Sequence, residues 1–219
     1  MPRVDLVIFD LDGTLIDSKL DIACAVNATR LRMGRPALDN DTVYSYVGNG
    51  APVLMRRAFP DASDEEVKQA LEFFLAYYRD HPLDNTKFYP GTGETLDRLQ
   101  AAGVKSAVLT NKPLGITKQI LEGLGASDRF VRVYGGESFP KRKPDPAGVN
   151  ALLSEFSISP ARAVMVGDSA VDMQTGRNAS ILACGVTYGF QPETLAAESP
   201  DVVFDDMADV AEWVLGGES

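Results

Sequence analysis

The chain has 219 residues, of which 45% are hydrophobic and 24% charged, a composition typical of a globular protein with a sizeable core. Its 31 acidic residues outnumber the 21 Lys and Arg residues, and the formal net charge is -10. This balance argues against nucleic acid or an anionic membrane as a partner, because both require basic surfaces.

The first predicted element is a short buried strand over residues 4–9, which ends at two aspartates, Asp10 and Asp12. On an extended chain, residues i and i+2 point to the same side, so both carboxylates project together. Adjacent carboxylates repel one another unless a positive charge lies between them. Magnesium is a hard cation that takes oxygen ligands, so the pattern predicts a Mg²⁺ site at the carboxyl end of this strand.

The following stretch has helical periodicity up to about residue 84. Ser18 and Asp21 form a capping-box pattern, which predicts a helix that ends near Gly34. A longer helix begins at Ser63, and its apolar stripe is expected to pack in a core. The stripe consists of Val67, Leu71, Phe74, Leu75 and Tyr78. Two shorter helices are expected over residues 41–47 and 52–59.

From Tyr89 onward, short apolar segments alternate with helical ones, as expected of parallel strands buried on both faces. The expected strands are residues 105–110, 131–134, 163–167, 182–186 and 202–204. The expected helices are residues 92–102, 114–123, 145–156, 170–178 and 207–215. With the first strand, this series predicts an α/β fold: a doubly wound, Rossmann-like parallel sheet with an inserted helical cap domain. Residues 1–16 and 85–219 would form the core domain and residues 17–84 the cap domain.

Polar side chains follow several of these strands. They are Asp10 and Asp12 after the first strand, Thr110, Asn111 and Lys112 after the second, Lys143 in a later loop, and Asp168 and Asp172 after the strand at 163–167. Ligands of open α/β sheets bind at the carboxyl ends of the strands, so these groups are expected to converge. Each signal alone is weak, since Asp168 and Asp172 could simply interact with a helix dipole. Their order and common placement favour a functional site.

Four segments, in their order and spacing, resemble the motifs of the haloacid dehalogenase superfamily. They are residues 10–14 (Asp-Leu-Asp-Gly-Thr), Thr110-Asn111, Lys143-Pro144 and residues 167–172 (Gly-Asp-Ser-Ala-Val-Asp). The resemblance implies that Asp10 is a nucleophile that forms an aspartyl phosphate, and that Asp12 is the general acid and base. Thr110 and Lys143 would hold the oxygens of the transferring phosphoryl group.

The same resemblance implies a magnesium ion held by Asp10, the backbone carbonyl of Asp12 and Asp168. Asp172 would contact these ligands and orient them. Dehalogenases need no acid to protonate a halide, and their motif lacks the equivalent of Asp12. Its presence here favours phosphoryl chemistry over dehalogenation.

The cap would select the substrate by closing over it. Residues 46–52 (Tyr-Val-Gly-Asn-Gly-Ala-Pro) resemble the specificity loop of phosphoglycolate phosphatases. Gly48, Asn49 and Gly50 are therefore expected to bind substrate together with Asn111, because glycine lets backbone amides approach a small carboxylate closely. An ordinary turn between two helices is the alternative for this loop.

Three functions remain open. The first is a magnesium-dependent phosphatase acting on 2-phosphoglycolate. The second is a phosphatase of another small phosphorylated metabolite, such as a sugar phosphate or pyrophosphate, or a phosphomutase of the same superfamily. The third is a non-catalytic binding or regulatory protein, which the filled catalytic positions disfavour. Monomer and homodimer are both compatible with the sequence.

The remaining residues of interest are expected to be structural. Arg56 and Arg57 lie on an amphipathic helix and should be solvated, and the single histidine, His81, should be structural. Cys24 and Cys184 form no motif and are expected to be buried or partly buried thiols. No apolar run approaches the roughly 20 residues that span a bilayer, and no signal-type segment is present, so we expect a cytoplasmic protein without membrane contact.

Overall fold

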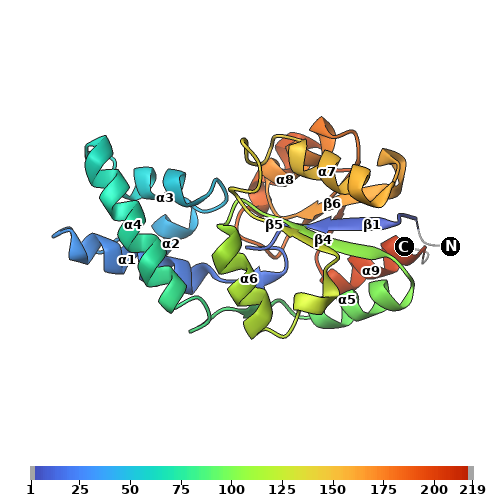
Figure 1. Cartoon of the computed structure of the whole chain (residues 1–219), viewed down its shortest axis with the longest axis horizontal. Helices are drawn as coiled ribbons and strands as arrows, with labels where there is room; N and C mark the ends of the chain where they lie inside the picture. Colours follow the sequence, from blue (N-terminus) through green and yellow to red (C-terminus); the bar gives the residue numbers. More distant parts are fainter. Residues whose placement is uncertain (1–2, 217–219) are drawn as a thin grey trace.

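The computed structural model of the chain describes residues 3–216, which form two parts lying end to end (Figure 1). The larger part is a six-stranded parallel sheet in the order β5-β4-β1-β6-β7-β8. Its strands are β1 (Leu6–Phe9), β4 (Lys105–Leu109), β5 (Arg132–Tyr134), β6 (Ala163–Gly167), β7 (Leu182–Val186) and β8 (Val202–Phe204). The chain moves outward from β1 in one direction and then returns to continue in the other, so the predicted doubly wound sheet is confirmed.

Helices cover both faces of this sheet. They are α5 (Thr92–Ala101), α6 (Leu114–Gly123), α7 (Ala147–Phe156), α8 (Ala170–Asn178) and α9 (Met207–Leu215). Leu6 and Ile8 pack in a cluster with residues of α7, whereas Val7 and Phe9 belong to a cluster with residues of α5, α6 and α9. Alternate side chains of a strand point to opposite faces, and all four are fully buried because each face has its own helical layer.

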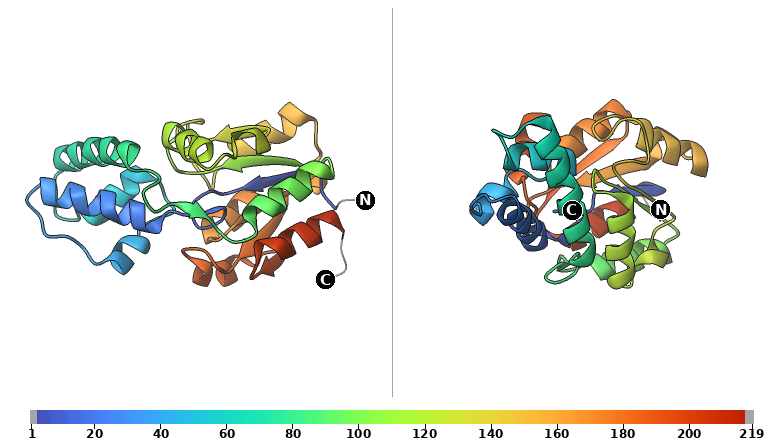
Figure 2. Two further views of the ribbon diagram at one scale, coloured as in Figure 1. Left: turned by 90° about the horizontal axis from the view of Figure 1, so that it is seen from below. Right: turned by 60° about the vertical axis from the view of Figure 1, so that its left-hand side comes forward.

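The smaller part consists of α1 (Lys19–Arg32), α2 (Asn40–Tyr44), α3 (Ala51–Ala58) and α4 (Asp64–Asp80). These helices lie beyond the carboxyl ends of the strands, on the side of the molecule away from both termini (Figures 1 and 2). They share a core to which Phe74 and Tyr78 of α4 contribute, so the apolar stripe on this helix does pack in a core. Ser63 caps α4 through a capping box with Glu66.

A two-stranded antiparallel ribbon connects the parts. The chain leaves the sheet through β2 (Ile16–Asp17) and returns through β3 (Lys87–Phe88), with Ile16 paired to Phe88 and Asp17 to Lys87. The sequence did not predict this ribbon, because two residues are too few to show strand periodicity. The entry and exit of the helical insertion are therefore adjacent in space.

Asp21 of α1 forms hydrogen bonds with Asn85 and Thr86, the residues just before β3, and so links the end of the insertion to its first helix. Its carboxylate is 3% exposed and accepts hydrogen bonds from the backbone N–H of Asn85 at 2.9 Å and of Thr86 at 2.8 Å. The side chains of Asn85 and Thr86 donate to it as well, both at 2.7 Å. These bonds hold the pKa of Asp21 below its usual value, against the effect of its burial.

The predicted capping box of Ser18 and Asp21 is therefore wrong, although α1 does begin at Lys19. Ser18 makes no side-chain cap, and its hydroxyl donates to Asp12 instead. Asp21 bonds residues 64 and 65 positions further along the chain, and Ser18 bonds a residue six positions before it, so a capping pattern that spans four residues reveals neither contact.

The predicted helices and strands are otherwise present, with their ends displaced by a few residues at most. Three short 3₁₀ segments, Ser127–Arg129, Pro160–Arg162 and Pro192–Glu198, were not predicted. Cys184 is buried as expected, whereas Cys24 is exposed and corrects the prediction, because it lies on the outer side of α1. Across residues 3–216, no helix combines the length and apolar character that crossing a membrane demands.

Candidate active site

Three neighbouring strands in the middle of the sheet bring the predicted residues together. Asp10 follows β1, Thr110 follows β4 on one side, and Asp168 follows β6 on the other. The register aligns these strands, with Phe9 opposite both Val108 and Val166. The groups therefore meet where the strand order reverses, the usual binding position of a doubly wound sheet.

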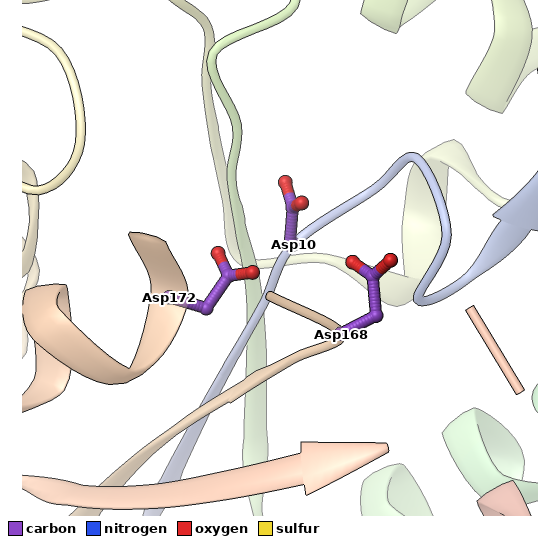
Figure 3. A group of neighbouring side chains, drawn as sticks. All are labelled: Asp10, Asp168 and Asp172. Atoms are coloured by element: carbon purple, nitrogen blue, oxygen red, sulfur yellow. The ribbon is translucent and has the colours of Figure 1, made fainter. Parts of the chain in front are cut away.

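Asp10, Asp168 and Asp172 form a buried acidic cluster (Figure 3). Each offers one carboxylate oxygen, and these oxygens all lie within 4.8 Å of one another. Asp172 belongs to the first turn of α8, directly after the β6 loop. The cluster needs a close backbone approach at Gly13, whose φ is 84°, since a Cβ there would lie 2.3 Å from Asp168 Oδ2.

Lys143 lies between two of these acids. Its Nζ is 2.8 Å from Asp10 Oδ1 and 2.6 Å from Asp172 Oδ1, and the side chain is almost completely buried. Burial alone would lower the pKa of Lys143, but the two carboxylates outweigh it and raise the pKa. The lysine is therefore a permanent cation at the base of the site.

One lysine does not balance the acidic cluster. Burial, reinforced by the neighbouring acids, raises the pKa of Asp10 to about 6 despite the opposing effect of Lys143. Burial and the charges of Asp172 and Asp10 raise the pKa of Asp168 to about 8. A divalent cation would remove this excess of negative charge, and carboxylate oxygens are the ligands that Mg²⁺ takes. The residues present therefore fit such an ion.

The carboxylate of Asp12 lies outside the acidic cluster. Lys112 Nζ donates to its two oxygens at 2.8 and 3.1 Å, and the Ser18 hydroxyl donates to it as well. Lys112 also donates to the Tyr78 hydroxyl at 2.5 Å and lies 4.4 Å from the centre of that ring. Burial tends to lower the pKa of Lys112, but Asp12 and Tyr78 reverse this effect and raise it.

Two of these contacts were missed by the sequence interpretation. Tyr78 was expected to serve the core alone, and Lys112 was noted after Thr110 and Asn111 without a role. The position of Lys112 at a strand end was a usable signal. The pairing with Asp12 was not visible, because 100 residues separate the two.

Thr110 and Asn111 both line the site, but their side chains are used differently. Thr110 is 3% exposed, and its hydroxyl accepts a hydrogen bond from the backbone N–H of Lys112. Asn111 donates to the carbonyls of Gly48 and Lys143 and accepts from the Lys143 N–H. The amide of Asn111 thus joins the insertion to the Lys143 loop, and both its N–H groups are already used.

A cleft with about 640 Å³ of empty space, part of it open solvent, lies between the strand ends and the insertion. Gly48 and Gly50 of the predicted loop line this cleft, whereas Asn49 is not among its lining residues in the described chain. Arg56 and Arg57 lie outside it. They donate to the carbonyls of Ala62 and Tyr46, respectively. His81 is also outside it and stacks on Tyr77 beside Asp84.

Comparisons with known proteins agree with this geometry. Residues 7–186 match the family model described as haloacid dehalogenase-like hydrolase. A phosphoglycolate phosphatase of Vibrio vulnificus is 40% identical over 97% of both chains. One of Rhodospirillum rubrum is 39% identical over 98% of this chain and 91% of that protein. A solved structure described as a predicted phosphoglycolate phosphatase from Haemophilus somnus has a TM-score of 0.92 and 34% identity, covering 97% of this chain and 98% of that one.

Proposed function

The chain belongs to the haloacid dehalogenase-like hydrolases, and we propose that it hydrolyses 2-phosphoglycolate to glycolate and phosphate. The observation that carries this proposal is the similarity, at 40% identity over 97% of both chains, to a phosphoglycolate phosphatase. The site adds a chemical reason, since it holds a carboxylate, a buried lysine and an acidic cluster at one sheet edge.

In the proposed reaction, a carboxylate oxygen of Asp10 attacks phosphorus, and the bond from phosphorus to the ester oxygen breaks. Lys143 lies 2.8 Å from Asp10 and would stabilise the phosphoryl oxygens as negative charge develops on them. Thr110, buried at the end of β4, would donate its hydroxyl to another of these oxygens.

Asp12 would transfer the protons. It gives one proton to the leaving ester oxygen, which releases glycolate, and takes one from the water that attacks the aspartyl phosphate. The second displacement returns the Asp10 carboxylate and frees inorganic phosphate. Ser18 and Lys112 fix the orientation of the Asp12 carboxylate for both steps.

We propose magnesium as the cofactor, held by Asp10, Asp168 and the backbone carbonyl of Asp12. Asp172, which the sequence interpretation placed behind the ligands, offers a carboxylate oxygen to the same cluster. When bound, the ion would neutralise charge between the phosphoryl oxygens and the carboxylates.

We further propose that residues 17–84 act as a cap domain over a core of residues 1–16 and 85–219. Gly48, Gly50 and Tyr78 of this part of the chain line the cleft together with the acids of the core. A cap in this position would exclude bulk water and restrict the leaving group to a small metabolite.

Phosphate release from a panel of phosphomonoesters, compared by kcat/KM with Mg²⁺ present, tests the function. We expect 2-phosphoglycolate to rank first, and Asp10→Asn to lower kcat by about 10³-fold or more. Asp128→Asn, at an exposed acid far from the site, is the matched control. Preference for a hexose phosphate or pyrophosphate by orders of magnitude would refute the substrate, and full turnover by Asp10→Asn would refute the mechanism.

A further inference from the structure

The cleft has an uneven distribution of charge. Among its lining residues, all within 3–216, three carry carboxylates: Asp10, Asp12 and Asp168. Lys112 is the only one of these lining residues with a cationic side chain. Lys143 is not among these lining residues, and its ammonium group lies between the carboxylates of Asp10 and Asp172.

The side chain of Lys112 is buried and held by fixed contacts, unlike that of a surface lysine. Its side chain is 3% exposed, and its ammonium group is held between Asp12 of the core and Tyr78 of α4. The ring of Tyr78 is buried in the core of the insertion and lies against the same ammonium group. The position of this charge is thus fixed from both parts of the molecule.

The leaving group of the proposed reaction must pass close to this charge. Asp12 protonates the ester oxygen, so that oxygen has to lie within hydrogen-bond distance of the Asp12 carboxylate. In 2-phosphoglycolate, the carbon that bears this oxygen also bears the carboxylate. The substrate carboxylate therefore lies on the Asp12 side of the cleft, where Lys112 Nζ is 2.8 Å from Asp12 Oδ1.

Electrostatics require a cation at that place. A substrate carboxylate that met only the lining acids would be repelled, and burying it without a partner would be costly. Lys112 is already desolvated in the cleft wall, and two of its three N–H donors go to the same carboxylate, so one of them can turn to the substrate carboxylate as a charge-assisted hydrogen bond while the other still holds Asp12. The glycine amides of the 46–52 loop supply no formal charge for this purpose.

We infer that Lys112, held by Tyr78, binds the carboxylate of the substrate. It would thereby select phosphorylated short acids over phosphomonoesters whose alcohol part carries no charge. This inference rests on the proposed function. The simpler role for Lys112 is to orient Asp12 alone, and the two roles differ in what they predict for a substrate without a carboxylate.

The test compares 2-phosphoglycolate with 2-hydroxyethyl phosphate, in which an alcohol replaces the carboxylate. For each enzyme, kcat/KM is measured on both substrates at saturating Mg²⁺. The readout is the ratio of kcat/KM for 2-phosphoglycolate to kcat/KM for 2-hydroxyethyl phosphate. Loss of Asp12 orientation lowers both values and leaves the ratio unchanged. We expect Lys112→Met to lower the ratio by roughly 10- to 100-fold, mainly through KM for 2-phosphoglycolate.

Two further variants complete the design. Tyr78→Phe keeps the ring and removes the hydroxyl that holds Lys112, so it should lower the ratio about threefold. If Lys112→Met does not fold, Tyr78→Phe is used to test the inference in its place. Arg142→Met is the matched control, because Arg142 lies near Gly50 but is exposed and does not line the cleft. Its ratio should equal that of the wild type.

An unchanged ratio in folded Lys112→Met, or in Tyr78→Phe where Lys112→Met does not fold, overturns the inference, as does a ratio that falls only in Arg142→Met. These outcomes leave the proposed function intact if the wild type still prefers 2-phosphoglycolate. A wild type that turns over other phosphomonoesters but not 2-phosphoglycolate overturns the proposed function itself, and the inference with it.

Discussion

Removal of the Asp21 carboxylate should loosen the connection between the two parts of the molecule. In the wild type this group accepts backbone hydrogen bonds from Asn85 and Thr86, together with one from each of their side chains. Asp21→Ala deletes all of these acceptors without adding a bulky group.

The loss in the free energy of unfolding depends on which donors are left without an acceptor. Thr86 is buried, so its N–H becomes an unsatisfied buried donor at a cost of about 1–3 kcal/mol. Asn85 is exposed and can bind water instead, which limits its contribution to about 0.5–1 kcal/mol. Alanine regains about 0.5 kcal/mol through its better helix propensity. The free energy of unfolding should therefore fall by about 2 kcal/mol, and Tm by about 4–8 °C.

Urea denaturation followed by circular dichroism, with Asp128→Asn as the control, measures this loss. The difference between wild type and Asp21→Ala should also depend on pH. Because folding lowers the pKa of Asp21, its stabilisation is present above the unfolded pKa of about 3.9 and is lost as pH falls through the folded value. A free energy of unfolding within about 0.5 kcal/mol of the control at pH 7 would refute the reasoning.

Three other predictions concern the acidic cluster. Asp172→Asn should raise the Mg²⁺ concentration for half-maximal activity by about 10- to 100-fold, measured by metal titration of phosphate release, and an unchanged titration would remove Asp172 from the metal site. Without a metal, folding raises the pKa of Asp168 to about 8 and that of Asp10 to about 6, so the chelated protein should lose stability as pH rises from about 4 through these values. Added Mg²⁺ should therefore raise Tm more at pH 8 than at pH 5. An equal rise in Tm at the two pH values would contradict this prediction. Gly13→Ala should abolish phosphate release and lower Tm, because its Cβ would overlap Asp168 at a φ of 84°, and an active variant with unchanged Tm would show that the loop can relax.

The sheet was predictable because its strands are local patterns. Each is a short apolar run bounded by Gly, Pro, Asn or Asp, and burial on both faces makes the run continuous. The convergence of Asp10, Thr110 and Asp168 followed from topology, since parallel strands end at one edge.

Most of the contacts that the sequence did not reveal join distant segments. Ser18 and Asp21 fit a capping box, yet Ser18 bonds Asp12 six residues before it and Asp21 bonds Thr86 beyond the helical insertion. Tyr78 fits a core stripe, and its ring does serve the core while its hydroxyl accepts from Lys112. Hydrophobic period and capping patterns describe neighbours along the chain, so they cannot identify a partner that only the fold brings near.

The ribbon of β2 and β3 has an evolutionary consequence. Because Ile16 and Phe88 are paired, the helical insertion begins and ends at one place and can be exchanged between relatives without disturbing the sheet. Such an exchange would carry Tyr78 along but leave Lys112 behind on the core. A chimaera built by grafting the insertion alone would therefore inherit only half of the lysine–tyrosine pair, and residue 112 would have to be grafted with it for the substrate preference to follow.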